Sequence, residues 1–264
     1  MLEILKSVMP SPEQMEMVIE GMRNHKNSWD RSDSYKTVIE DPQTHETADF
    51  EFFIGENDLQ LMSCLVAGGP VHAKYRRMMP VFVTINAPLY WWKEFDTYKI
   101  GTVCNICSTM HKIHAKPFDI SDFSCEHLMT VEDYDGDEHD IPLVQYRTDE
   151  YVKFSPKGVL NITIDMLNLA RERYLTALKT EEHTGYSAKD IWWQMIQLLP
   201  SSYNQRRTIM LNYEVLANIY KSRKDHKLDE WHTFCEWIEN LPYSELITND
   251  NIFIIGVDLN HANS

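Results

Sequence analysis

Residues 87–112 carry side chains that could do chemistry together. The segment reads APLYWWKEFDTYKIGTVCNICSTMHK and mixes aromatic rings, charges and small polar groups. Aromatic faces can stack on planar ligands, and small polar groups can hydrogen-bond to them. Such a mixture suits neither a core nor a solvated face alone, so we interpret the segment as the wall of a binding site. For any single ring among the seven Trp and thirteen Tyr of the chain, ordinary core packing is the alternative.

A Cys-x-x-Cys motif within this segment raises the question of a metal or redox centre. Cys104 and Cys107 are followed by His111 and His114, which together could be counted as four zinc ligands. The intervening loops are shorter than in the usual zinc ribbon, and the chain has no second Cys-x-x-Cys. A thioredoxin-like role needs a strand before the motif and a helix after it, and the sequence does not predict that context. We therefore expect no metal, and small side chains in a pocket wall.

Composition narrows the class of protein. The 264 residues are 43% hydrophobic, which is enough for one α+β domain over 1–264. The net charge of -15 argues against an extended nucleic-acid surface, although a few local cations could bind one nucleotide. The N-terminus does not resemble a secretory signal, no apolar run is long enough for a membrane span, and five scattered cysteines fit a reducing cytoplasm. Motifs for a P-loop, a dinucleotide-binding turn or a nucleophile elbow are absent.

Apolar spacing predicts several helices and few strands, which indicates an α+β fold. Ser11 and Asp58 are candidate helix caps, and Gly101 is a candidate helix end. The acidic run at 132–140 lacks the closing glutamate of a calcium loop, so we interpret it as a solvated loop. The predicted helices cover 11–23, 58–66, 88–100, 159–180, 187–199, 203–221 and 228–240, the predicted strands cover 49–54 and 80–87, and 251–257 is predicted to be a closing strand or a tail.

Several motifs resemble those of the flavin-dependent thymidylate synthases (the ThyX family). That family carries RHRxxSxNExSxRY after a strand and an Ala-Pro. Here Ala87-Pro88 precedes Thr97-Tyr98-Lys99 at the RHR position, and Cys104, Asn105, Cys107 and Thr109 stand at the family's Asn, Glu, second Ser and next Arg. Upstream, where the family has GHxTPxEH, a predicted helix ends at Gly68-Gly69, His72 and Lys74 stand at the His and Thr, and Arg77-Met78 stands at the Glu-His.

The downstream half of the resemblance lies on a predicted helix. The family reads LP, then NxRSLxxFLxLR, then D, H and AQWE. Here Leu199-Pro200 is followed by Asn212, Glu214, Leu216, Asn218 and Arg223, and then by Asp225, His226 and Trp231. The spacing from Asn212 to Arg223 places both on neighbouring turns of one helix face. The motifs cover residues 58–112 and 187–240.

The resemblance implies a central antiparallel sheet flanked by long helices, and a homotetramer with sites shared between subunits. It implies that dUMP is methylated to dTMP with FAD as cofactor and with methylenetetrahydrofolate and NADPH as co-substrates. Arg223 matches the Arg that favours ionisation of the pyrimidine N3, which makes it the candidate catalytic residue. The flavin-contacting positions are His72, Lys74, Thr97, Tyr98, Lys99, Asn105, Asn212, Glu214 and Asn218. The nucleotide-contacting positions are Glu94, Thr97, Asn105, Ile106, Cys107, Ser108, Thr109 and Arg223.

Two departures from the family pattern change the charge of the site. Glu214 stands where the family has an Arg near the flavin, and Thr97 stands where it has a phosphate-binding Arg. Losing such charge-assisted contacts costs on the order of 2–3 kcal/mol each if nothing replaces them. Four other cations could compensate or could be plain surface residues: Lys93, Lys99, Arg206 and Arg207.

Three functions therefore stay open. The chain is a flavin-dependent methyltransferase of dUMP with a rearranged site, or an enzyme of the same fold that adds a one-carbon group to another pyrimidine nucleotide. Alternatively, it is a non-catalytic nucleotide-binding or scaffold protein on that fold.

Overall fold

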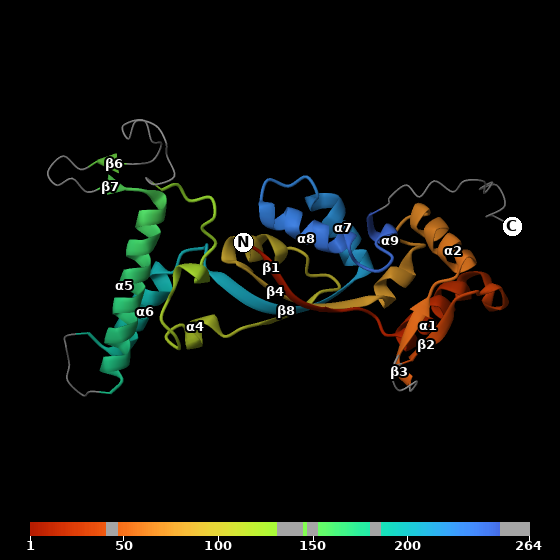
Figure 1. Cartoon of the computed structure of the whole chain (residues 1–264), viewed down its shortest axis with the longest axis horizontal. Coiled ribbons are helices and arrows are strands. Elements are labelled where there is room, and N and C mark those ends of the chain that lie inside the picture. Colours follow the sequence, from red (N-terminus) through yellow and green to blue (C-terminus); the bar gives the residue numbers. More distant parts are fainter. Residues whose placement is uncertain (41–46, 131–144, 147–152, 180–185, 249–264) are drawn as a thin grey trace. The chain divides into compact units, whose positions relative to one another are not determined.

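The largest sheet among the described residues has four strands in the order β1-β4-β8-β5. In the computed structural model, the described residues are 1–40, 47–130, 145–146, 153–179 and 186–248. Backbone hydrogen bonds join Leu89 N to Tyr203 O at 3.0 Å and Tyr213 N to Met79 O at 3.2 Å. Because the partner numbers run in opposite directions, β4 and β8 are antiparallel, as we expected of an α+β fold (Figure 1).

Strands and helices are mixed along the described part of the chain. The strands are β1 (Glu3–Val8), β2 (Tyr35–Glu40), β3 (Thr47–Phe53), β4 (Pro80–Pro88), β5 (Val103–Ile106), β6 (Gln145–Tyr146), β7 (Lys153–Phe154) and β8 (Asn204–Asn212). The helices are α1 (Pro12–Arg23), α2 (Glu56–Ala67), α3 (Leu89–Phe95), α4 (Thr109–Lys112), α5 (Pro156–Ala177), α6 (Ala188–Leu198), α7 (Tyr213–Arg223), α8 (Asp229–Glu239) and α9 (Glu245–Thr248).

The chain groups into two compact units. The first contains residues 1–3, 86–95 and 106–207, and the second contains residues 4–85, 96–105 and 208–264. Strands β1, β4, β5 and β8 each carry residues of both units. The boundary between the units therefore falls within strands and not only in the loops that connect them.

In the first unit, α5 and α6 lie side by side (Figure 1). Both helices were predicted, and Ser155 and Ser187 cap their first turns. Their inner faces pack on the segment that follows α4. The shared core contains Ile113, Phe118, Phe123, Leu160, Ile164, Leu167 and Met195.

In the second unit, α1 confirms its prediction in detail. Ser11 caps the helix in a capping box with Gln14, and the predicted apolar stripe, Met15 to Met22, is buried. Helix α2 also forms, but Asp58 is not its cap. The cap position is Gly55, and Asp33 reaches across from another loop, where its carboxylate accepts hydrogen bonds from the backbone N–H groups of Asn57 and Asp58.

The predicted helix over 203–221 is wrong in its first half. Residues Asn204–Asn212 form strand β8, in which every second residue from 205 to 211, including Ile209 and Leu211, is buried and the residues between them are exposed or half-buried. The helix begins only at Tyr213. Burial alternates from residue to residue along this segment, which is the two-residue period of a strand. The apolar residues at 209, 210 and 216, however, also fit the stripe of a helix. Pairing with β4 decides between them, because every second side chain of β8 enters the core.

The helix after Pro88 is shorter than predicted. It ends at Phe95 rather than at Gly101, and its apolar face, with Trp91, Trp92 and Phe95, is fully buried. The strands predicted at 49–54 and 80–87 correspond to β3 and β4. The acidic run at 132–140 and the closing strand or tail predicted at 251–257 lie outside the described residues. Among the described helices, none is long and apolar enough to cross a membrane.

Candidate functional site

The guanidinium of Arg223 is oriented by two aromatic residues in the second unit. Its Nε donates a hydrogen bond to the Tyr98 hydroxyl at 2.9 Å. Its Cζ lies 4.7 Å from the ring centre of Trp231, which is fully buried, and 5.6 Å from that of Tyr98. These contacts fix a permanent cation at the end of α7. The structure thus brings together Tyr98 from the 87–112 segment and the Arg that the resemblance implies is catalytic.

The loop that carries Tyr98 also approaches the other end of α7. Gly101 has φ +77°, and a Cβ at this position would lie 3.1 Å from Val215 Cγ2 and 3.2 Å from Asn212 Nδ2. A side chain there would be strained and crowded, which accounts for the glycine. The 96–105 loop therefore passes close to the first turn of α7 at Gly101 and contacts its last turn through Tyr98.

From the spacing we expected Asn212 and Arg223 on neighbouring turns of one helix. The structure instead places them at opposite ends of α7. Asn212 is the N-cap of α7, where its Oδ1 accepts a hydrogen bond from Val215 N at 3.1 Å, and Arg223 is the last residue of the helix. At about 1.5 Å of rise per residue, the two lie about 16 Å apart along the helix axis. A ligand that touches both must extend along α7.

The charge of Glu214 is compensated within the protein. Its buried carboxylate faces Arg76, which lies on the short 3-10 helix Lys74–Met78, and Arg76 Nη1 is 3.7 Å from Glu214 Oε2. Arg76 is itself only 6% exposed. Among the described residues, Arg76 Nε and Nη2 and Glu214 Oε2 have no hydrogen-bond partner. The reversed charge at 214 therefore has its counter-ion, and the pair retains unused donors and acceptors.

Sequence reasoning missed Arg76, although a signal for it existed. Relative to the family pattern, the chain exchanges an acid for a base at Arg77 and a base for an acid at Glu214. Because the two reversals are of opposite sign, they leave the net charge unchanged, and this was the available signal for a cation that compensates Glu214. The structure shows that the base in contact is the neighbouring residue, Arg76.

Several of the remaining flavin-contacting candidates are exposed in the second unit. The side chains of Lys74, Lys99, Asn105 and Asn218 make no hydrogen bond or ion pair with the described residues. Thr97 is also exposed, and the exposed His72 ring lies 6.1 Å from the ring of His25. Exposure leaves these groups accessible to a ligand, but the structure does not bring them together as it does Tyr98 and Arg223.

Thr109, a nucleotide-contacting candidate, belongs to a buried polar network in the first unit. Gln205 Nε2 donates to Thr109 Oγ1 at 2.7 Å, and Gln205 Oε1 accepts from Arg207 Nε at 2.9 Å. The Arg207 guanidinium stacks 4.4 Å from the ring centre of Trp92. Arg207 is therefore a buried structural residue rather than one of the surface cations that the sequence had suggested. Gln205 carried no sequence signal.

A small pocket lies beside this network. It measures about 300 Å³, and Cys107, Ser108 and Thr109 line it together with Tyr203. Burial, with smaller contributions from Asp122 and Cys107, raises the pKa of the Tyr203 hydroxyl. Three of the nucleotide-contacting candidates are therefore adjacent to one cavity. Two further candidates belong to the same unit but do not line the pocket: the half-buried Glu94 on α3, and Ile106, which is exposed.

The five cysteines are not gathered with other metal-ligating side chains in the part of the chain that the structure describes. All five are free thiols, and no group of three or more His, Cys, Asp or Glu side chains is close enough to hold an ion. Cys107 lines the pocket of the first unit, as a wall residue would, whereas Cys104 belongs to the second unit.

The architecture is that of an α+β protein with an antiparallel sheet and helices, and solved structures identify the fold more closely. No family model and no curated protein matches the sequence. Thymidylate synthase X (ThyX) from Helicobacter pylori, solved with FAD and dUMP, aligns with a TM-score of 0.52 and 14% identity over 94% of this chain and 95% of that chain.

A second ThyX structure from the same organism, also complexed with FAD and dUMP, aligns with a TM-score of 0.50 and 12% identity over 94% of this chain and 96% of that one. The UMP/dUMP methylase PolB from Streptomyces cacaoi aligns with a TM-score of 0.47 and 14% identity over 90% of this chain and 88% of that one. The fold of the chain is therefore ThyX-like. A sequence identity of 12–14% supports a shared fold but not a shared function, so the function depends on the residues of the site.

Proposed function

We propose that the protein is a flavin-dependent thymidylate synthase that methylates dUMP to dTMP, with methylenetetrahydrofolate as the one-carbon donor. The observation that carries this proposal is the anchored cation at the end of α7, where Tyr98 and Trp231 orient Arg223. The similar fold of proteins solved with FAD and dUMP supports it.

Arg223 would act on the pyrimidine ring. A guanidinium keeps its charge at any working pH, so it stabilises the anion that forms when N3 loses its proton. Tyr98 is a positioning residue in this scheme, because it acts through its hydrogen bond to Arg223. Cys107, Ser108 and Thr109 line the pocket of the first unit, and we propose them separately as nucleotide contacts of that unit.

The residues around α7 fit a flavin. The buried Arg76 has two unused donor nitrogens, and exposed Lys74 and Lys99 add cations without described partners. Together with Tyr98 and Asn212, these groups would hold the cofactor and hydrogen-bond to its polar atoms. A bound flavin, once reduced by NADPH, would supply the hydride that reduces the transferred one-carbon group. The remaining flavin-contacting candidates, His72, Thr97, Asn105, Glu214 and Asn218, stay proposals of the same kind.

A second candidate function is nucleotide binding without catalysis. The feature that favours it is the loss of the phosphate-binding Arg at Thr97, for which Arg207 is no substitute, because Arg207 is engaged with Gln205 and Trp92. One-carbon transfer to another pyrimidine nucleotide would also explain a changed phosphate contact. We further propose a single functional domain that assembles as a homotetramer with shared sites and works in the cytoplasm.

The flavin test separates the catalytic proposal from its alternative. The purified protein should be yellow, or should take up added FAD with the absorbance bands of a bound flavin. A colourless protein that binds no FAD would favour nucleotide binding without catalysis. Binding of dUMP, dCMP and dUTP should be titrated in parallel, because tighter binding of dCMP would change the proposed substrate.

The role of Arg223 is tested by substitution. Arg223→Ala should lower the turnover of dUMP by about a hundredfold or more, the scale of losing one transition-state contact. Flavin affinity should stay near that of the unmodified protein. Arg223→Lys, which keeps a charge, should retain more activity than the alanine variant, and Arg173→Ala on α5 is the matched surface control. Unchanged turnover in Arg223→Ala would remove the assignment.

A further inference from the structure

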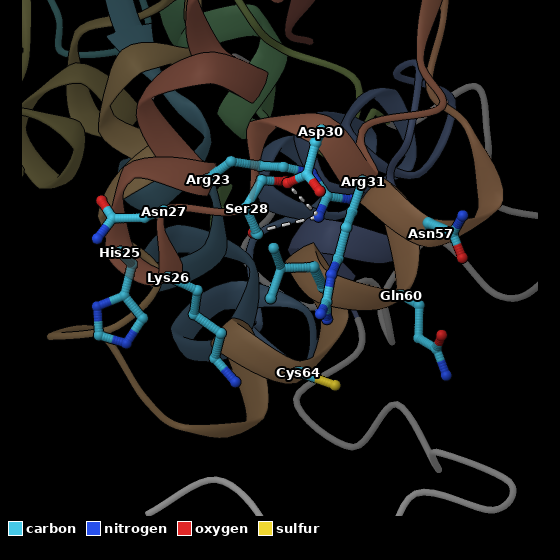
Figure 2. Close-up of a pocket in the computed structure, with 11 residues that line it drawn as sticks. Arg23, His25, Lys26, Asn27, Ser28, Asp30, Arg31, Asn57, Gln60 and Cys64 are labelled. Carbon is cyan, nitrogen blue, oxygen red and sulfur yellow. Dashed lines mark hydrogen bonds between the residues drawn. The ribbon is translucent and has the colours of Figure 1, made fainter. Parts of the chain in front are cut away.

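A pocket of about 860 Å³ opens in the second unit, at the place where the end of α1 and the two short helical turns after it face α2 (Figure 2). None of the flavin-contacting or nucleotide-contacting candidates lines it. Its lining is polar and includes the cations Arg23, Lys26 and Arg31, with Asp30 as an acid. The chain carries a net charge of -15, so a local group of cations needs an explanation.

Arg23 forms a rigid part of the wall. It is 4% exposed, its Nε donates to Asp58 Oδ1 at 2.6 Å, and its Nη1 donates to the backbone oxygen of Ser28 at 3.3 Å. Asp58, which is fully buried, also accepts hydrogen bonds from the hydroxyls of Ser32 and Ser34 at 2.7 Å each. The Ser–Asp–Ser segment after the pocket therefore binds α2 rather than a ligand.

One nitrogen of Arg23 is left without an acceptor. Among the described residues, Nη2 is buried and has no hydrogen-bond partner. A buried donor without a hydrogen-bond partner is rare, because the missing hydrogen bond costs about 1–3 kcal/mol. The contacts of Nε and Nη1 fix the position of Nη2, and Asp58 already balances the charge of Arg23. An acceptor on a ligand would therefore complete the hydrogen bonding of Arg23. The positive charge that attracts an anionic ligand must come from two other residues.

Lys26 and Arg31 supply that charge. Both side chains are exposed, and neither makes a hydrogen bond or an ion pair with the described residues. Figure 2 shows them extending in the same direction from the segment that follows α1. An Arg fork beside a Lys point charge is a common arrangement for binding phosphate. The amide side chains of Asn57 and Gln60, on the facing helix, add neutral donors and acceptors.

We propose that this pocket binds the phosphate group of a nucleotide-sized ligand. The pocket volume of about 860 Å³ is larger than a free phosphate ion would occupy and falls in the range of small-molecule and cofactor sites. Lys26 and Arg31 hold the phosphate, Arg23 Nη2 donates to an oxygen of the ligand, and the amides of α2 contact its uncharged part. The site does not depend on flavin binding or on Arg223, and it adds a second anion site to the proposed function.

The test uses the full chain and inorganic pyrophosphate as the probe, with binding measured by titration calorimetry at low ionic strength. Lys26→Gln and Arg31→Gln should each weaken binding about tenfold, the low end for a charge-assisted contact because both side chains are exposed to solvent. Both residues are exposed, so the variants should fold, which circular dichroism would verify. Lys189→Gln, an exposed lysine on α6, is the matched control and should bind like the unmodified protein.

Three outcomes would overturn the proposal: no saturable pyrophosphate binding, equal affinity in both pocket variants and the unmodified protein, or an equal loss in Lys189→Gln. A triglutamate peptide tests carboxylate as the alternative anion, and its binding more tightly than pyrophosphate would refute the phosphate assignment. Flavin uptake by the variants should be unchanged, which separates a failure of this site from a failure of the proposed function.

Discussion

Removing Arg76 while keeping Glu214 should strongly destabilise the protein. The two charges are 3.7 Å apart and their side chains are only 7% and 12% exposed. At an effective dielectric constant of about 20, their attraction is about 4.5 kcal/mol. Arg76→Met would leave a buried carboxylate without a counter-ion, a change that costs about 3–5 kcal/mol in comparable pairs. Glu214→Leu should cost a similar amount, because it leaves the buried guanidinium unpaired.

The double variant Arg76→Met, Glu214→Leu should recover most of this loss. With both charges gone, no desolvated ion remains, and apolar groups of similar size fill the space. The assay is urea unfolding followed by tryptophan fluorescence, with the free energies of unfolding combined in a double-mutant cycle. We expect a coupling energy of about 3 kcal/mol or more. Additive effects of the two substitutions, or a cost below about 1 kcal/mol for Arg76→Met, would refute the assignment of a compensating pair.

Three further substitutions test the packing around both units. Burial alone would raise the pKa of Asp58, but its hydrogen bonds to the two serines and Arg23 lower it overall. Its contribution to stability is therefore present above about pH 4 and is lost as the pH falls further, so the cost of Asp58→Asn should shrink between pH 6 and pH 3 in urea unfolding. Gly101→Ala should cost about 1–2 kcal/mol in the same assay, since φ +77° disfavours a side chain. Thr109→Val should cost about 1–3 kcal/mol, because the buried Gln205 amide loses its acceptor.

Much of the local structure could be predicted from the sequence. Helix α1 was predicted with its cap and buried stripe, because a capping Ser followed by helical apolar spacing is a local signal. Strand β4 was predicted from its alternation, which the burial of Val81, Val83 and Ile85 confirms. Strand β8 was not, because its apolar residues fit two periods, and only pairing with β4 selects one. The cap of α2 comes from Asp33, which is distant in sequence and gives no local signal.

For the candidate site too, some features could be predicted from the sequence and others depended on the tertiary structure. The sequence by itself determined the residue types that could bind an anionic planar ligand, and the place of Arg223 and Tyr98 among them. Only the tertiary structure decided that Tyr98 holds Arg223, that Arg76 balances Glu214, and that Arg207 is engaged in the core. Each of these pairs joins residues more than 100 positions apart, except where Arg207 reaches Gln205 two positions away. Spacing along the chain specifies which side chains share a helix face or a strand face, whereas contacts between distant segments depend on how those faces pack.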